Sequence, residues 1–155
     1  MSNAGILNTA AGSTLSIGTT ATDPVTDSYT AIGKPTNLGE FGRVYKLIPF
    51  EGLDDRNTLK FKGSRDDGSM AIDLGKVGSD QGQAALLVAL DSDLDYNFKL
   101  TLNDSTGVSG ATPTTYYFKA KVMKAPIVVG GPNNVVMLKT ELQIKSGSIT
   151  EVGAS

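Results

Sequence analysis

The sequence contains no cysteine, no histidine and no tryptophan. Without cysteine and histidine there are no disulfides, no thiolate or imidazole metal ligands, no cysteine nucleophiles and no serine–histidine relay. These absences exclude most hydrolytic chemistry. We therefore expect a protein that is not an enzyme and that holds no metal ion or cofactor.

The sequence also lacks an excess of charge of either sign and any long apolar run. Its 14 Lys and Arg residues are set against 16 Asp and Glu residues, which gives a formal net charge of −2. A basic excess is what neutralises a DNA backbone, so sequence-specific DNA binding is disfavoured. No stretch reaches the roughly 18 apolar residues of a membrane-spanning helix, and residues 1–8 lack the features of a signal peptide. We expect a soluble cytosolic protein with no membrane anchor.

Two regions of different composition follow one another along the 155 residues, a length typical of one domain. Residues 1–28 are rich in Gly, Ser, Thr, Ala and Asn, and such a segment packs weakly on its own. We therefore expect an extended N-terminal arm over residues 1–28 and a single β-domain over residues 29–155. The apolar residues of the arm that are expected to contact a neighbouring subunit are Ile6, Leu7, Leu15 and Ile17.

Alternation of polar and apolar residues recurs from Tyr29 onward and is typical of half-buried strands. Residues 57–74 are predicted to form a hairpin that turns at Asp66-Asp67-Gly68, with Leu59 and Phe61 on one strand facing the apolar residues of the other. The other predicted strands are 44–50, 97–102 and 114–121 as a second hairpin, 135–145, and 148–152.

One passage predicts a helix, over about residues 80–91. Ser79-Asp80 supplies an N-cap, and strong helix formers follow it. Its apolar residues are expected to cover the sheet with one broad face, made of Ala84, Leu87 and Val88 with Leu86, Leu90 and Leu94 beside them. The chain is therefore predicted to be mainly β, an antiparallel sandwich or barrel of about six to eight strands with one short flanking helix.

Three charged or aromatic motifs have an ordinary structural interpretation. Residues 91–95 alternate three aspartates like the start of a calcium loop, but Tyr96 stands where glycine is needed and Leu102 where glutamate is needed. The carboxylate pairs in 54–56 and 65–67 are interpreted as solvated loop charges, since no aromatic cluster accompanies them. Alternation separates the aromatic and basic residues of 116–121 onto opposite faces, which argues against an RNA-binding platform.

The order of the predicted elements resembles that of the tail tube proteins, or major tail proteins, of long-tailed bacteriophages. The resemblance covers roughly residues 29–152, and that family is related in fold to type VI secretion tube proteins. It is carried by Gly63-Ser64-Arg65-Asp66-Asp67-Gly68, Gln81-Gly82-Gln83-Ala84-Ala85-Leu86, Tyr117-Phe118-Lys119-Ala120-Lys121-Val122, Leu138 to Gly147, and Ile149-Thr150-Glu151-Val152.

The resemblance implies a structural virion protein that forms six-membered rings, which stack into a hollow tube. Double-stranded DNA would leave the capsid through this tube without specific binding. The implied partners are other copies of the chain, the tail tip or baseplate, the tape measure protein and the tail terminator. The implied location is the tail of the virion, with assembly in the host cytoplasm.

The candidate surface for ring stacking is the loop from Pro49 to Asn57, which joins two predicted strands. It places apolar side chains in an acidic segment, and exposed apolar side chains of this kind mark contact sites. The alternative, that Phe50 and Leu53 pack beneath their own loop, stays equally open. The expected stacking residues are Pro49, Phe50, Glu51, Leu53, Asp54, Asp55 and Arg56.

A different class of function is also compatible with a small β-domain. A monomeric β-sandwich could bind carbohydrate or a surface protein. The absence of tryptophan weighs against sugar binding, because sugar platforms favour exposed aromatic faces and only five Tyr and five Phe are available. A glycan array and a test of concentration-dependent assembly would separate the two hypotheses.

Overall fold

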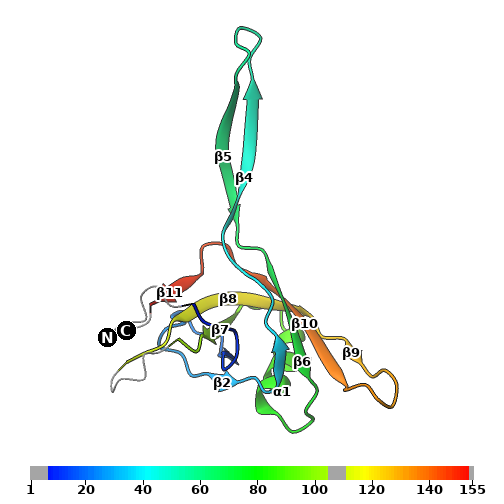
Figure 1. Cartoon of the computed structure of the whole chain (residues 1–155). Helices are drawn as coiled ribbons and strands as arrows, with labels where there is room; N and C mark the ends of the chain where they lie inside the picture. Colours follow the sequence, from blue (N-terminus) through cyan, green and yellow to red (C-terminus); the bar gives the residue numbers. More distant parts are fainter. Residues whose placement is uncertain (1–6, 105–110, 154–155) are drawn as a thin grey trace.

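The computed structural model of the chain describes residues 7–104 and 111–153 and shows a mainly β protein in that part of the chain. Eleven strands and one helix are found there, arranged as a body from which a long hairpin projects (Figure 1). The elements are β1 (Thr14–Ile17), β2 (Thr30–Ala31), β3 (Pro35–Asn37), β4 (Val44–Glu51), β5 (Thr58–Asp66), β6 (Ser69–Gly75), α1 (Gln81–Leu90), β7 (Tyr96–Thr101), β8 (Thr115–Lys124), β9 (Ile127–Val128), β10 (Met137–Ile144) and β11 (Thr150–Val152).

The body is built on one large antiparallel sheet of nine strands. Its strand order is β2-β1-β7-β8-β10-β6-β3, with β11 paired to β8 and β9 paired to β10. The predicted mainly β fold with one helix is confirmed. The sheet stays open and does not close into a barrel. The remaining two strands, β4 and β5, pair only with each other and form a separate two-stranded sheet.

Alternate residues of the large sheet form the hydrophobic core, on the face that carries α1. The second predicted hairpin is confirmed, because β7 pairs with β8 in a register that places Phe98 opposite Phe118. These two rings stack with their centroids 5.6 Å apart, and both side chains are fully buried. The predicted long strand is also confirmed as β10, whose alternate residues Leu138 and Leu142 are fully buried.

The helix begins at its predicted N-cap but presents a different face to the sheet. The side chain of Asp80 accepts hydrogen bonds from the backbone N–H groups of Gln83 and Gly33, which fixes the first turn against the body. The buried residues are Gly82, Gln83, Leu86 and Ala89. The expected face was wrong in its larger part, since Ala84, Val88 and Leu94 are exposed and Leu87 is only half-buried.

A buried glutamine explains why apolar spacing gave the wrong helix face. The Gln83 side chain donates hydrogen bonds to the carbonyl oxygens of Gly33 and Gly75, at 3.1 and 2.8 Å, and accepts one from the Val77 N–H at 3.0 Å. A polar side chain whose hydrogen bonds are satisfied can be buried without penalty. Gln83 thus ties α1 to two separate loops, and this tie sets the rotation of the helix.

The prediction of an extended arm over residues 1–28 is wrong for the central part of that segment. Residues 14–17 form β1, which lies within the large sheet between β2 and β7. Leu15 and Ile17 are buried in the core at 0% and 2% exposure. The stretch is a strand because its alternate residues match the apolar face of β7, with Leu15 opposite Leu100 and Ile17 opposite Phe98.

The prediction that residues 57–74 form one hairpin is also wrong. β5 pairs with β4, whereas β6 lies between β10 and β3 in the large sheet. Leu59 and Phe61 therefore do not face the apolar residues of β6. The alternation correctly indicates two strands, but period-two spacing identifies the apolar face of a strand and does not identify the strand with which it pairs.

Candidate assembly surface

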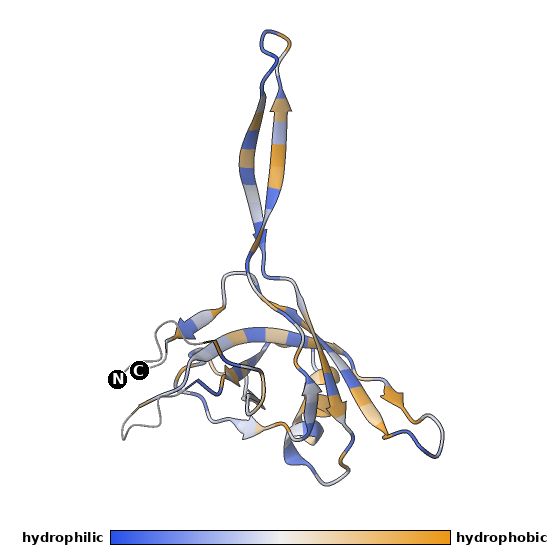
Figure 2. Ribbon diagram, viewed as in Figure 1, coloured by the Kyte–Doolittle hydropathy of each residue, from blue (hydrophilic) through white to orange (hydrophobic). Residues whose placement is uncertain are grey.

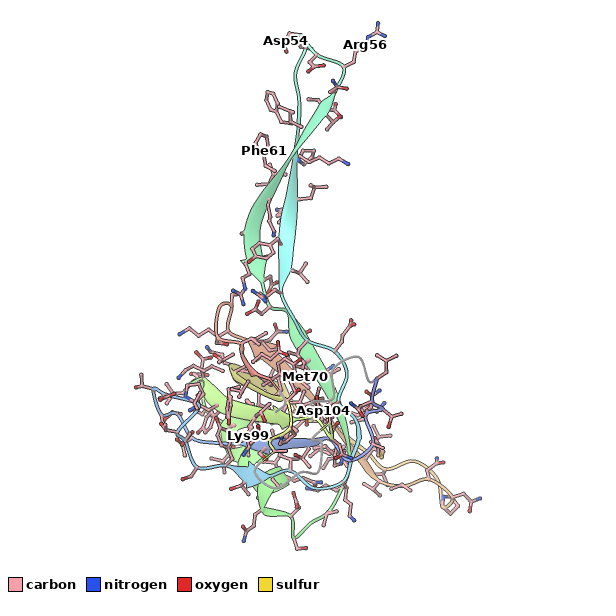
Figure 3. The ribbon with its side chains drawn as sticks, turned by 60° about the vertical axis from the view of Figure 1, so that its left-hand side comes forward. Asp54, Arg56, Phe61, Met70, Lys99 and Asp104 are labelled. Atoms are coloured by element: carbon pink, nitrogen blue, oxygen red, sulfur yellow. The ribbon has the colours of Figure 1, made fainter. Side chains whose placement is uncertain are left out.

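The β4–β5 hairpin extends from the body as a free-standing arm (Figures 1 and 3). Eight residues of β4 at about 3.3 Å per residue give it a length of about 26 Å. Asp54 and Arg56 lie at its far tip, and Phe61 projects from its middle (Figure 3). An isolated two-stranded hairpin is marginally stable in water, so an arm of this length normally requires a third strand or packing against another element.

One face of the hairpin is apolar. Ile48 stands opposite Phe61, and two residues further Phe50 stands opposite Leu59, so all four side chains project from the same face. Their exposed fractions are 48% for Ile48, 54% for Phe61, 57% for Phe50 and 51% for Leu59. About half of each side chain is already covered by its neighbours, and the other half faces water. We call these four residues the apolar face of the hairpin.

The opposite face of the hairpin is mixed and partly charged. Here Leu47 stands opposite Lys62, and Pro49 stands opposite Lys60. The Lys62 ammonium lies 4.1 Å from the centre of the Tyr45 ring, a cation–π contact that covers part of this face. In Figure 2 hydrophobic and hydrophilic residues alternate along β5, whereas the middle of β4 is continuously hydrophobic. The hairpin is therefore amphipathic although its own body covers neither face.

The tip of the hairpin carries most of the predicted stacking residues. Pro49, Phe50 and Glu51 end β4, and the loop that follows is closed by the Asn57 N–H, which donates a hydrogen bond to Asp55 Oδ1 at 3.0 Å. Leu53 is fully exposed. The alternative that Phe50 and Leu53 pack beneath their own loop therefore does not hold for the isolated chain. All seven predicted residues, Pro49, Phe50, Glu51, Leu53, Asp54, Asp55 and Arg56, are exposed.

An ion pair between half-buried Arg65 and buried Asp67 fixes the base of the hairpin to the body. Arg65 donates from Nε to Asp67 Oδ1 at 2.8 Å and from an Nη to Asp67 Oδ2 at 3.1 Å. The Gly147 N–H also donates to Asp67 Oδ2, at 2.9 Å. Burial acts to raise the pKa of Asp67, but the bonds from Arg65 and Gly147 outweigh it, and the pKa is lowered from its ordinary value. The carboxylate thus connects the last residues of β5 to the turn between β10 and β11.

Sequence reasoning missed three of the four residues of the apolar face. Leu59 and Phe61 were expected to face the apolar residues of the strand that follows, and Ile48 was not singled out. The available signal was the alternation of Ile48 and Phe50 along β4, which matches that of Leu59 and Phe61 along β5. A pairing of these two segments would have indicated a hairpin whose apolar face has no body residues to cover it.

The four arm residues predicted to contact a neighbour are placed differently from one another. Leu15 and Ile17 belong to the core of their own subunit, so their assignment to a contact between subunits is corrected. Leu7 is 97% exposed and stays a candidate for such a contact. Ile6 lies outside the described residues.

Three further features concern ligand, metal and membrane binding. A surface pocket of about 470 Å³ is lined by residues that include Phe41, Arg43, Tyr116 and Glu151. In residues 7–104 and 111–153, no group of three or more acidic side chains is placed to hold a metal ion. The one helix of the described part, α1, is too short to cross a bilayer.

Comparison with known proteins rests on structure alone. No protein-family model matches the sequence, and no curated protein matches it either. A chain of the anti-feeding prophage baseplate, determined by cryo-electron microscopy with six-fold symmetry, is similar with a TM-score of 0.67. The two sequences are 14% identical, and the match covers 96% of this chain and 97% of that one.

Two further solved structures are similar over most of their length. A chain of the sheath/tube terminator of the extracellular contractile injection system PVC matches with a TM-score of 0.67 and 12% identity, over 97% of this chain and 99% of that one. The tail tube of SPP1 matches with a TM-score of 0.63 and 16% identity, over 91% of this chain and 76% of that one. The resemblance to tail tube proteins is therefore confirmed for the fold.

Proposed function

We propose that this protein is a structural component of a phage tail, whose copies form stacked hexameric rings that build the tail tube. The main observation that supports this proposal is the β4–β5 hairpin, which exposes four apolar side chains on a two-stranded arm. An apolar face of this kind costs free energy in water and marks a contact site. A second copy of the chain is the simplest partner that covers it.

The similar structures support a tube over other assemblies. They include a tail tube and a sheath/tube terminator, and one of them was determined with six-fold symmetry. A structural role without catalysis agrees with these neighbours. The baseplate or tail tip, the tape measure protein and the terminator would then be the partners at the tube ends, and the tail of the virion would be the location.

The charge of the chain suits a conduit for DNA. Its net charge of −2 is repeated in every copy, so a ring is acidic as a whole. Like-charge repulsion between a ring and a DNA backbone limits adhesion during passage. The tube would in this way guide double-stranded DNA during ejection without binding it specifically.

The test is assembly of the purified full chain, followed by sedimentation velocity and negative-stain electron microscopy at increasing concentration. Sulfate is added in a parallel series, because it strengthens apolar burial. Rings of constant diameter that stack with a fixed axial repeat are expected. A chain that stays monomeric in every condition would contradict the proposal, as would amorphous aggregates without rings.

A pair of variants tests whether this assembly depends on the apolar face of the hairpin. Phe61→Ser removes one of the two phenylalanine side chains of the apolar face, whereas Lys60→Ser changes its neighbour on the opposite face. We expect Phe61→Ser to raise the concentration needed for assembly several-fold and Lys60→Ser to have little effect. Circular dichroism of both variants checks that the body remains folded. Equal behaviour of the two variants would exclude the apolar face from assembly.

A further inference from the structure

Two chain connections join the β4–β5 hairpin to the body, and each contains a glycine at the same level. Val44 stands opposite Asp66 in the strand pair nearest the body. Gly42 lies two residues before Val44, and Gly68 lies two residues after Asp66. Both glycines have positive φ, +151° and +75°, and a Cβ on either one would meet nothing within 4 Å. The backbone is therefore least restricted where the hairpin leaves the body.

The chain is fixed on the body side of both glycines. On the first connection, the Phe41 ring stacks on the buried Phe118 ring with the centroids 5.6 Å apart. On the second, the Gly68 carbonyl oxygen accepts a hydrogen bond from the Ile144 N–H at 3.0 Å. The body thus holds the chain as far as Phe41 and again from the Gly68 carbonyl onward. A change in the direction of the hairpin would then take place at the two glycines.

Surface pockets adjoin this part of the chain. The pocket of about 470 Å³ extends from Gly42 and Arg65 toward Ile149, beside β11. A second pocket, of about 400 Å³, is lined by Gly42, Gly68 and the first residue of β6. The hairpin can lean into this space without displacing packed side chains. Because the arm is long, a turn of about 20° would move its tip by about 9 Å.

One buried carboxylate holds the hairpin across this gap. Asp67 lies on the hairpin side of Gly68 and is 1% exposed. Its Oδ2 accepts a hydrogen bond from the Gly147 N–H at 2.9 Å, and its backbone N–H donates to Ser146 Oγ at 3.4 Å. The Arg65 guanidinium binds both of its carboxylate oxygens, and such paired, charge-assisted bonds fix orientation well. We call these bonds the Asp67 clamp.

We propose that the β4–β5 hairpin turns as a unit about Gly42 and Gly68, and that the Asp67 clamp holds it in the direction shown in Figure 1. The ladder between β4 and β5 stays paired during this motion. Asp67 is thus a positioning residue for the apolar face. The inference goes beyond the proposed function, because it concerns the single chain and is tested without assembly.

A rigid β-ribbon is the competing arrangement, since β5 ends only two residues before β6 begins. Strand pairing argues against it. β5 pairs with β4, whereas β6 pairs with β10 and β3. Within residues 7–104 and 111–153, no strand pair runs from the hairpin into the large sheet. The direction of the hairpin therefore depends on the Asp67 clamp and not on a continuous ladder.

The absence of cysteine from the sequence allows spin labels to be placed at chosen pairs. Asn57→Cys, near the hairpin tip, is combined with Asn133→Cys in the turn after β9 or with Val152→Cys at the end of β11. β9 and β11 lie on opposite sides of the hairpin base in Figure 1. Pulsed electron paramagnetic resonance measures both distances in the full-length monomer, diluted with unlabelled protein.

Each labelled pair is measured with the clamp intact, with Asp67→Ser, and with Glu40→Gln. Glu40 is an exposed carboxylate beside the same pocket and is the matched control. We expect narrow distance distributions with the clamp intact and with Glu40→Gln, and distributions about two-fold wider for both pairs with Asp67→Ser. Adding Gly42→Ala to Asp67→Ser should narrow them again, because alanine rarely adopts the positive φ of glycine. Adding Gly78→Ala should not.

Narrow distributions in folded Asp67→Ser would overturn the inference, as would wide distributions with the clamp intact or a Gly42→Ala change without effect. A third label pair, Lys46→Cys with Asn57→Cys, lies within the hairpin and should keep one narrow distance. Its broadening would show that the strands separate instead of turning together. Circular dichroism checks folding. If Asp67→Ser does not fold, Arg65→Met replaces it, and unchanged widths would overturn the inference equally.

Discussion

Asn97 and Asp27, separated by 70 residues in the chain, are joined by a hydrogen bond of 2.9 Å from Asn97 Nδ2 to Asp27 Oδ2. The same Nδ2 donates to the Ala21 carbonyl oxygen, and the Thr19 N–H donates to Asp27 Oδ2 at 2.7 Å. Asn97 is fully buried in β7. This amide therefore helps to fasten residues 19–28, which contain no strand, to the large sheet, together with the Asn97 backbone N–H, which donates to the Thr19 carbonyl oxygen, and Lys119 Nζ, which donates to the Ala21 carbonyl oxygen.

Replacing this amide is expected to loosen the N-terminal segment. Asn97→Ala removes the amide donor to the Ala21 carbonyl and the Asp27 carboxylate, which keep bonds from Lys119 and Thr19, and we expect it to lower the free energy of unfolding by about 0.5–1.5 kcal/mol. Asn103→Ala is the matched control, since the Asn103 amide also bonds to a backbone carbonyl but is exposed. Urea unfolding measures both variants. An equal loss in both would contradict a special role for Asn97.

The acid stability of the protein is expected to depend on Asp67. Its pKa is lowered in the folded protein from an ordinary value of 3.8. A carboxyl group whose pKa is lower in the folded state stabilises that state above its unfolded pKa, and this stabilisation is lost as the pH falls through the folded pKa. We therefore expect the free energy of unfolding to fall with decreasing pH below about 4.

Asp67→Asn tests this assignment. It removes the charge but keeps a side chain of nearly the same shape at the base of the β4–β5 hairpin. The variant is expected to be less stable than wild type at neutral pH and to show a smaller further loss between pH 5 and acid, as measured by thermal unfolding at each pH. An unchanged pH profile would assign the acid sensitivity to other carboxylates, of which Asp27 is the first candidate because its pKa is also lowered.

The sequence predicts most clearly those elements whose signals are local. The N-cap at Asp80 located the start of α1, and alternation located β7, β8 and β10. The partner of β5 could not be found in this way, because an apolar face that stays exposed has the same period as one buried in the core. Leu59 and Phe61 were expected to face the apolar residues of β6 for this reason.

Two other features were beyond sequence reasoning because they depend on tertiary contacts. Gln83 is buried because three backbone groups from two loops surround its amide, and nothing in its neighbours along the chain indicates them. β1 lies in a segment poor in large apolar residues, and only its pairing with β7 makes it part of the core. Local propensity is a weak guide where tertiary contacts decide.

Gly82 in the first turn of α1 is expected to tolerate no side chain. A Cβ at this position would overlap the carbonyl oxygen of Ala31 and the backbone of Ile32, which cannot rotate away. Gly-to-Ala changes within helices usually stabilise a protein by about 1 kcal/mol, but here overpacking reverses the sign. Gly82→Ala should lower the free energy of unfolding by about 1–3 kcal/mol. Gly78→Ala, with open space around its Cβ, is the control in the same denaturant titration and should be nearly neutral.

The β4–β5 hairpin is expected to open more readily than the body in the monomer. Among residues 7–104 and 111–153 no third strand pairs with β4 or β5, whereas β10 has paired strands on both sides. Local opening is easiest where few buried apolar contacts hold the backbone. Amide hydrogen exchange should therefore be fast in residues 44–66 and slow in β10, and assembly should slow it in residues 44–66. Equal protection of both segments in the monomer would contradict this expectation.

Leu53 offers a final test of the hairpin tip, because its side chain is fully exposed and contributes nothing to the core of its own subunit. Leu53→Asp adds a fourth carboxylate to the tip and removes its central apolar group. We expect the thermal stability of the monomer to be unchanged, within about 0.5 kcal/mol, and tube growth to be abolished. Leu53→Ala separates the two effects, since it removes apolar surface without adding charge and should weaken growth less. Normal tubes of Leu53→Asp in electron micrographs would show that the tip lies outside the contact between rings.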